Sequence, residues 1–166
     1  MEHHSQGPSG VEVRRCTADD AAALASYGIG TSVYVAGALE RHGRGEVDFL
    51  VVLYAGVVAG SAELTFDDPP ELKNLSVETE FRGRGLGSAL ITYAETLIEL
   101  RHPGARVGER ALLVGVGLDN PEAARLYERL GFVRTGRICT TTYEYADELG
   151  VSRAATERDE DLIKRW

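Results

Sequence analysis

Residues 82–88 read RGRGLGS and stand directly before a segment with the apolar spacing of a helix. The first backbone N–H groups of a helix lack intrahelical partners and carry the positive end of the helix dipole. Glycines let a ligand approach that backbone closely. These residues therefore predict an anion-binding site at the start of a helix.

Two common phosphate motifs do not fit this loop. A dinucleotide-binding fingerprint counted from Gly83 and Gly85 needs its third glycine where Ser88 stands. The phosphate loop of nucleotide hydrolases needs a lysine after Gly87, and none is present. The residues alone leave the anion open, and a plain strand-to-helix turn is the simplest alternative.

Periodicity and turn signals predict the elements that must position this loop. The helix that begins at Leu86 has a predicted buried face made of Leu86, Ala89, Leu90, Tyr93, Ala94, Leu97 and Ile98. We expect one mixed α/β sheet rather than a doubly wound one. The first half contains a strand over 11–15, a helix from Ala18 capped by Thr17, a helical piece over 32–40, a hairpin that turns at Ala55-Gly56 and a strand over 71–77. The helix from Leu86 to 102–104 follows, and then a strand over 110–118 that we expect to be buried on both faces. The last elements are a helix that starts at Asn120-Pro121 and stops at Gly131, and a terminal hairpin that turns at 147–150.

Composition and charge narrow the function. The formal net charge of −8 argues against nucleic acid as a partner. The longest apolar run, over 49–60, is too short to span a membrane. Two cysteines without metal spacing and four histidines without a metal constellation predict no metal site and fit a reducing cytoplasm. We expect residues 1–10 to be a flexible leader and residues 11–166 to form a single domain.

Two signatures extend the pattern around the glycine loop. NLSVETEFRGRGLGSALI contains R-x-x-G-x-G over residues 82–87, and LDNPEAARLYERLGFVRTG follows later in the chain. Together with the opening VEVRRCTADDAAAL, they resemble the GCN5-related N-acetyltransferase (GNAT) family over residues 11–166. The resemblance implies a single, mostly antiparallel mixed sheet flanked by helices, and transfer of an acetyl group from acetyl-CoA to an amine. It makes the expected anion the pyrophosphate of coenzyme A.

The resemblance also assigns cofactor contacts. The loop N–H groups would hold the pyrophosphate, and the loop arginines would neutralise its charge. The strand over 75–77 would pair with the pantetheine arm and aim a backbone N–H at the thioester carbonyl. Asn120 would cap its helix and meet the arm, with Ala123 small enough to let the arm pass. The predicted cofactor-binding residues are Leu75, Ser76, Val77, Arg82, Gly83, Arg84, Gly85, Leu86, Gly87, Ser88, Asn120 and Ala123.

Direct acyl transfer needs a neutral amine, a polarised carbonyl and a proton for the departing thiolate. Glu71 is the predicted base, because its parity on the strand would place it on one face with Leu75. Glu63 and ordered water are the alternatives, and a solvated strand end is the competing interpretation. Tyr127 is the predicted acid, since it shares a helix face with Asn120, and packing is its competing interpretation.

The acceptor stays open at this level. Acidic residues outnumber basic ones over 144–161, which would attract a polyamine, an aminoglycoside, an amino acid or a protein N-terminus. Such a run is also typical of a solvated surface. We expect a small-molecule or peptide amine as partner, no nucleic acid and no membrane, with a homodimer left open. The alternative to an enzyme is a non-catalytic module that binds acyl-CoA as a sensor or docking domain.

Overall fold

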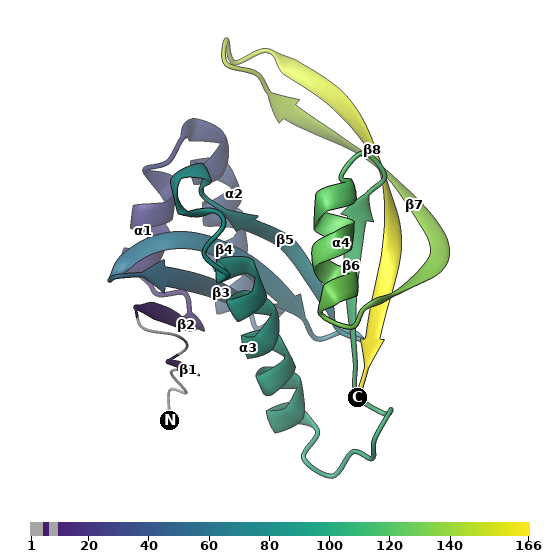
Figure 1. Cartoon of the computed structure of the whole chain (residues 1–166). Coiled ribbons are helices and arrows are strands. Elements are labelled where there is room, and N and C mark those ends of the chain that lie inside the picture. The colour runs from purple at the N-terminus through teal and green to yellow at the C-terminus, as the bar shows by residue number, and fades with distance from the viewer. Residues whose placement is uncertain (1–4, 7–9) are drawn as a thin grey trace.

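The computed structural model describes residues 5–6 and 10–166, which form one eight-stranded sheet and four α-helices (Figure 1). The strands lie in the order β1-β2-β3-β4-β5-β6-β8-β7. The elements are β1 (Ser5–Gln6), β2 (Val11–Arg15), α1 (Ala18–Ala25), α2 (Ile29–Gly43), β3 (Val47–Tyr54), β4 (Val57–Thr65), β5 (Glu71–Val77), the short 3₁₀ helix η1 (Thr79–Phe81), α3 (Leu86–Arg101), β6 (Ala111–Gly117), α4 (Pro121–Arg129), β7 (Val133–Ala146) and β8 (Ser152–Arg165).

All neighbouring strands run antiparallel except β5 and β6, which are parallel. A parallel pair needs a long crossover, and α3 supplies it. The predicted fold class, a single mixed and mostly antiparallel sheet flanked by helices, is confirmed. Of the predicted leader, residues 1–4 and 7–9 lie outside the described residues, and Ser5–Gln6 pairs with β2.

Helices pack on both faces of the sheet. On one face, α3 and α4 enclose a cluster that includes Leu50, Val52, Leu64, Leu72, Leu112 and Leu162. On the other face, α1 and α2 enclose a cluster that includes Phe49, Val51, Leu53 and Val58. Alternate residues of β3 pack into the two clusters, because successive side chains of a strand point to opposite faces of the sheet. This strand is therefore buried on both faces.

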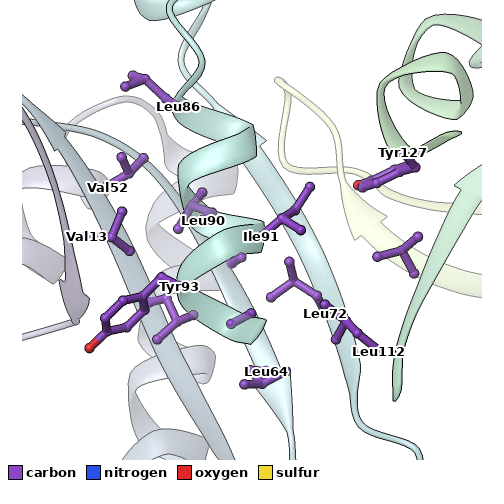
Figure 2. Packing of buried hydrophobic residues seen from close by; sticks show 14 of the residues in the cluster. Val13, Val52, Leu64, Leu72, Leu86, Leu90, Ile91, Tyr93, Leu112 and Tyr127 are labelled. Atoms are coloured by element: carbon purple, nitrogen blue, oxygen red, sulfur yellow. The ribbon is translucent and has the colours of Figure 1, made fainter. Parts of the chain in front are cut away.

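The apolar face of α3 is close to the predicted one. Six of the seven predicted residues are buried, whereas Ala89 is only partly buried and Ile91 joins the interior. Because α3 contacts every strand from β2 to β5, its buried face is broader than a single stripe. Figure 2 shows Leu90 and Ile91 between the helix and the strands that carry Val52 and Leu72. Among the described residues, no helix is both long and apolar enough to cross a membrane.

Helix ends follow their local signals. Thr17 caps α1 in a capping box, in which its side chain accepts from the Asp20 N–H while the Asp20 carboxylate accepts from the Thr17 N–H. Asn120 caps α4, its side-chain oxygen accepting from the Ala123 N–H at 3.2 Å. Gly131, with a φ of 94°, follows the last turn of α4. Only α2 is longer than predicted, at both ends.

The prediction that residues 110–118 form a strand buried on both faces is wrong for one face. Val114 is buried toward α3 and α4, whereas Gly115 is exposed and Leu113 and Gly117 are only partly buried. In the described part of the chain, the helices on that side, α1 and α2, pack mainly on β3 and β4, and this side of β6 stays partly exposed. We call this side of β5, β6 and β8 the open face.

Candidate active site

Pairing between β5 and β6 is short and leaves a free backbone edge. The two strands are in register only at Glu71 and Leu72 of β5. On its other side, β5 stays paired with β4 as far as Val77. Residues 75–77, the predicted pantetheine strand, therefore lie on an edge that no described strand completes. Such an edge can pair with an extended ligand.

The glycine loop opens α3 with uncommitted N–H groups. Gly83 and Gly85 have φ values of 75° and 76°, and a Cβ on either would meet open space. Gly85 is the N-cap of α3 and provides no side-chain cap. Within the described part of the chain, the N–H groups of residues 83–88 donate no hydrogen bond. Gly87 serves packing instead, since a Cβ there would touch Leu75 at 3.6 Å.

The two arginines of the loop are anchored beside it. Arg82 Nε donates to the Val77 carbonyl oxygen at 3.0 Å. The Arg84 guanidinium lies 4.7 Å from the centroid of the Tyr54 ring. Both arginines are exposed and keep further N–H donors for an anion. The loop thus combines open space, backbone donors and two positive charges.

A β-bulge interrupts β5, so the alternation of its side chains between the two faces of the sheet is reversed after the bulge. Asn74 has a φ of 54°, and the register with β4 shifts beside it. Leu75 and Val77 consequently pack against the cluster under α3, whereas Glu71 lies on the open face. The prediction that Glu71 shares a face with Leu75 is wrong, because one inserted residue reverses the alternation.

Acidic side chains surround Gly115 on the open face. A Cβ at Gly115 would stand 3.9 Å from Glu71 Oε1 and 3.8 Å from Asp159 Cβ, and Asp161 lies opposite Gly115 in the register. Burial raises the pKa of Glu71, and Asp161 and Asp159 add to the rise. A carboxylate with a raised pKa is better matched to accept a proton near neutrality. In the described residues, no group of three or more His, Cys, Asp or Glu is placed to hold a metal, and a metal-free reaction stays a prediction.

Glu63, the alternative base, is committed to a buried network. It is 2% exposed and accepts hydrogen bonds from Tyr34 at 2.9 Å, from Arg41 at 2.8 and 3.0 Å, and from the Asn74 amide at 2.8 Å. Burial alone would raise the pKa of Glu63, but these donors lower it below its usual value. A carboxylate with engaged oxygens and a lowered pKa is poorly suited to take a proton. The network instead ties α2 to the bulge in β5.

Tyr127 reaches from α4 into the interior between α4 and α3. It is 7% exposed and packs edge-on against Phe132, with ring centroids 5.6 Å apart. Figure 2 shows its hydroxyl pointing away from α4, toward the side where Ile91 stands. The hydroxyl makes no hydrogen bond within the described part of the chain, and burial raises the pKa of Tyr127. The phenol therefore keeps its proton at neutral pH, uncommitted to any described acceptor.

Asn120 and Ala123 lie at the start of α4, as predicted. The Asn120 side-chain oxygen is engaged as the helix cap, and the residue is exposed. Ala123 is partly buried against the interior. The exposed amide nitrogen of Asn120 is thus the group with which this residue can meet a ligand, and the cofactor contacts of both residues stay predictions.

A cavity of about 270 Å³ lies across β5 from the cluster under α3. It is lined by Leu24, Thr31, Tyr34, Gly60, Ser61, Ser76 and Glu78. Gly60 has no room for a side chain, since a Cβ there would collide with the Ser76 carbonyl oxygen. Sequence reasoning missed Gly60, Glu78 and the cavity, because the lining comes from two helices and two strands. The one available signal was the position of Glu78 directly after a predicted strand.

Comparison with known proteins places this geometry among related folds. A family model for the acetyltransferase (GNAT) domain matches residues 45–134. An uncharacterized N-acetyltransferase from Methanocaldococcus jannaschii is 39% identical over 62 residues, which are 37% of this chain and 25% of that protein. The match thus spans about a quarter of the relative's length.

Solved structures share the fold along nearly the whole chain. A ribosomal L7/L12 alpha-N-protein acetyltransferase has a TM-score of 0.70 at 14% identity, covering 100% of this chain and 96% of that chain. A putative acetyltransferase from Salmonella typhimurium, solved with its cofactor acetyl-CoA, has a TM-score of 0.60 at 22% identity, covering 95% and 94%. At these identities the likeness shows the fold.

Proposed function

This chain belongs to the GNAT acetyltransferase family, and on this premise we propose that it transfers an acetyl group directly from acetyl-CoA to an amine of a small molecule or peptide. One observation carries the proposal. The free edge of β5 runs from the bulge at Asn74 toward the glycine loop, Glu71 stands at the start of the same strand, and Tyr127 points its uncommitted hydroxyl into the interior next to it. A loop of backbone donors, an unpaired strand edge, a candidate base and a candidate acid therefore lie along or beside β5, which supports the proposal.

The residues present fit coenzyme A. The uncommitted N–H groups of residues 83–88 and the open space at Gly83 and Gly85 suit a pyrophosphate, with Arg82 and Arg84 beside it. Residues 75–77 offer backbone groups to the amides of a pantetheine arm. A backbone N–H on this edge would stabilise the negative charge that develops on the thioester oxygen.

The chemistry then follows from two side chains. Glu71 accepts a proton from the ammonium form of the acceptor, directly or through water, and frees its lone pair. The amine nitrogen forms a bond to the thioester carbon, and the nitrogen, now cationic, releases its second proton to solvent. The carbon–sulfur bond breaks as the tetrahedral intermediate collapses. The Tyr127 hydroxyl gives its proton to the departing thiolate, so the products are the amide and coenzyme A. Solvent restores the phenol proton and takes the proton held by Glu71.

The decisive experiment combines binding with turnover. Asparagine tolerates positive φ, so Gly85→Asn keeps the turn while it fills the space of the anion, whereas valine would strain the backbone. Gly45→Asn is the matched control, since Gly45 has a φ of 72° and open space at the end of α2. We expect acetyl-CoA binding by calorimetry to be lost in Gly85→Asn alone. Equal binding by both variants would refute the assignment of the loop.

Turnover separates an enzyme from a binding module. Release of free coenzyme A during incubation of the wild-type chain with acetyl-CoA and a panel of primary amines is the expected result. Tight acetyl-CoA binding without release for any amine would favour a non-catalytic sensor or docking domain. We also propose that residues 11–166 act as one catalytic domain in the cytoplasm. Two free cysteines, Cys16 and Cys139, are consistent with a reducing compartment.

A further inference from the structure

The cavity beside β5 borders the proposed reaction path. Ser76 contributes its side chain to the cavity and its backbone to the free edge of the strand. Leu75 and Val77 point the other way, into the cluster under α3. The cavity therefore lies directly across one strand from the place where residues 75–77 would hold the thioester arm. A group joined to the acceptor amine can occupy it while the amine meets the thioester.

The charge inside the cavity has one sign. Among the described residues that line the cavity, Glu78 is the only carboxylate and none is Lys, Arg or His. The Tyr34 hydroxyl donates to Glu63, and burial raises the pKa of Tyr34, so this phenol stays neutral. Arg41, the cation behind Tyr34, is itself paired with Glu63 at 2.8 Å. An entering ligand thus meets one negative charge and no compensating positive one.

The remaining lining is small and hydroxylated. Thr31, Ser61 and Ser76 supply hydroxyl groups, and Leu24 and Gly60 supply an apolar wall. The volume, about 270 Å³, lies just below the range of roughly 300–1,000 Å³ typical of pockets for whole small-molecule ligands. The cavity is therefore suited to one compact end group, and the rest of a larger ligand would lie outside it.

A second carboxylate, Glu80, lies with Glu78 near Tyr27. Tyr27 donates its hydroxyl to the Val58 carbonyl oxygen, and the pKa of Tyr27 is raised by burial and by the nearby charges of Glu80 and Glu78. A carboxylate that approaches this region meets like charge at close range. Like charges set against each other across a binding surface are a strong means of rejecting the wrong ligand.

From this geometry we propose that the cavity is the acceptor's specificity pocket and that it selects amines without a carboxylate beside the amino group. The favoured class is a compact α-amino amide, as at the start of a peptide chain, and the rejected class is the free α-amino acid. Glu78 is the specificity-determining residue. This inference rests on the proposed acetyltransferase function and narrows its acceptor.

A matched pair of probes tests it. Serinamide and serine carry the same side chain and differ in the carboxylate, whose replacement also makes the amine less basic, so the change in their ratio between wild type and Glu78→Gln is the decisive measurement. We expect kcat/KM, measured by coenzyme A release, to favour serinamide over serine by about tenfold or more. Glu78→Gln should shrink this ratio, and Glu78→Lys should reverse it by offering a cation to the carboxylate. Glu46→Gln is the control, since it removes an equal charge from an exposed side chain that does not line the cavity.

Equilibrium binding separates this inference from the proposed function. Calorimetry of serinamide and serine, each titrated into protein saturated with coenzyme A, measures their affinity for the pocket without the reaction. Tighter serinamide binding that is lost in Glu78→Gln supports the pocket even if no amine is acetylated, in which case the proposed function alone fails. Equal affinities, binding of neither probe, or a preference unchanged in Glu78→Gln would overturn the pocket while leaving acetyl transfer to another acceptor intact.

Discussion

Replacing Glu63 by glutamine should destabilise the region around the bulge in β5. It should not remove a catalytic base. The carboxylate accepts four hydrogen bonds, from Tyr34, Asn74 and twice from Arg41, and is 2% exposed. Glutamine keeps one oxygen, which can face Arg41, and turns an NH₂ group toward Asn74 and Tyr34. The tyrosine hydroxyl can reverse and accept, whereas the Asn74 amide must flip or lose its bond.

The magnitude follows from the change in bond type. Hydrogen bonds to a charged group contribute about 1.5–3 kcal/mol against about 0.5–1.5 kcal/mol for neutral ones, a loss of roughly 1 kcal/mol per bond. Arg41 is 37% exposed, so its two bonds count for less. We expect the free energy of unfolding to fall by about 3 kcal/mol in Glu63→Gln. For a domain of this size, that corresponds to a Tm lower by about 6–12 °C.

The pH dependence gives an independent check. The pKa of Glu63 is below its ordinary value of 4.5, so its ionised form stabilises the fold above that pH and loses this contribution as pH falls through the folded pKa. The Tm difference between wild type and Glu63→Gln should be full at pH 7 and shrink below about pH 4.5. Glu46→Gln, at an exposed pair with Arg44, is the control and should melt like wild type. An unchanged Tm together with loss of the acidic limb of the pH–rate profile would refute this reasoning and make Glu63 the base.

Four further substitutions test the proposed site. Tyr127→Phe should lower kcat by about 10²–10⁴-fold. Tm and acetyl-CoA affinity should change little, because the hydroxyl makes no hydrogen bond in the described residues. A variant with the kcat of the wild type would refute the role of Tyr127 as the acid. Glu71→Gln should lower kcat by about 10²-fold and abolish the acidic limb of the rate profile. Since burial, Asp161 and Asp159 raise the pKa of Glu71, Asp159→Asn should move that limb to lower pH in an otherwise active enzyme, and an unmoved limb would assign it to another group. Gly60→Ala should weaken acetyl-CoA binding and lower Tm, because its Cβ would push the Ser76 carbonyl and β5 away from β4. Gly43→Ala is the control and should do neither, since a Cβ there meets open space. Equal Tm values for the two variants would show that β5 can shift without loss of stability.

Features encoded by neighbouring residues were predictable from the sequence. The caps at Thr17 and Asn120 depend on side chains that bond within one turn, and both formed as predicted. The buried face of α3 followed from its apolar spacing, and the turn at Ala55-Gly56 followed from its residues. The glycine loop could be found because uncommitted N–H groups and positive φ are local properties of the chain.

Features that depend on distant partners were not predictable. Nothing in ELKNLSV marks Asn74 as a bulge, apart from the tolerance of asparagine for positive φ, so the parity of Glu71 was assigned incorrectly. The burial of Glu63 depends on Tyr34 and Arg41, far away in sequence. One side of β6 is open because α1 and α2 pack elsewhere on the sheet. The residue pattern within 110–118 does not encode the position of those helices.

The short contact between β5 and β6 has a mechanical consequence. The part of the sheet from β1 to β5 and the part from β6 to β7 share backbone bonds at one end only, so a small rotation between them breaks few hydrogen bonds. An extended arm seated along residues 75–77 would supply backbone partners that β6 does not and would stiffen this joint. In the proposed reaction, binding of the acyl donor would therefore stiffen the joint between the two parts of the sheet. Departure of coenzyme A would restore the compliance that lets the acetylated product leave.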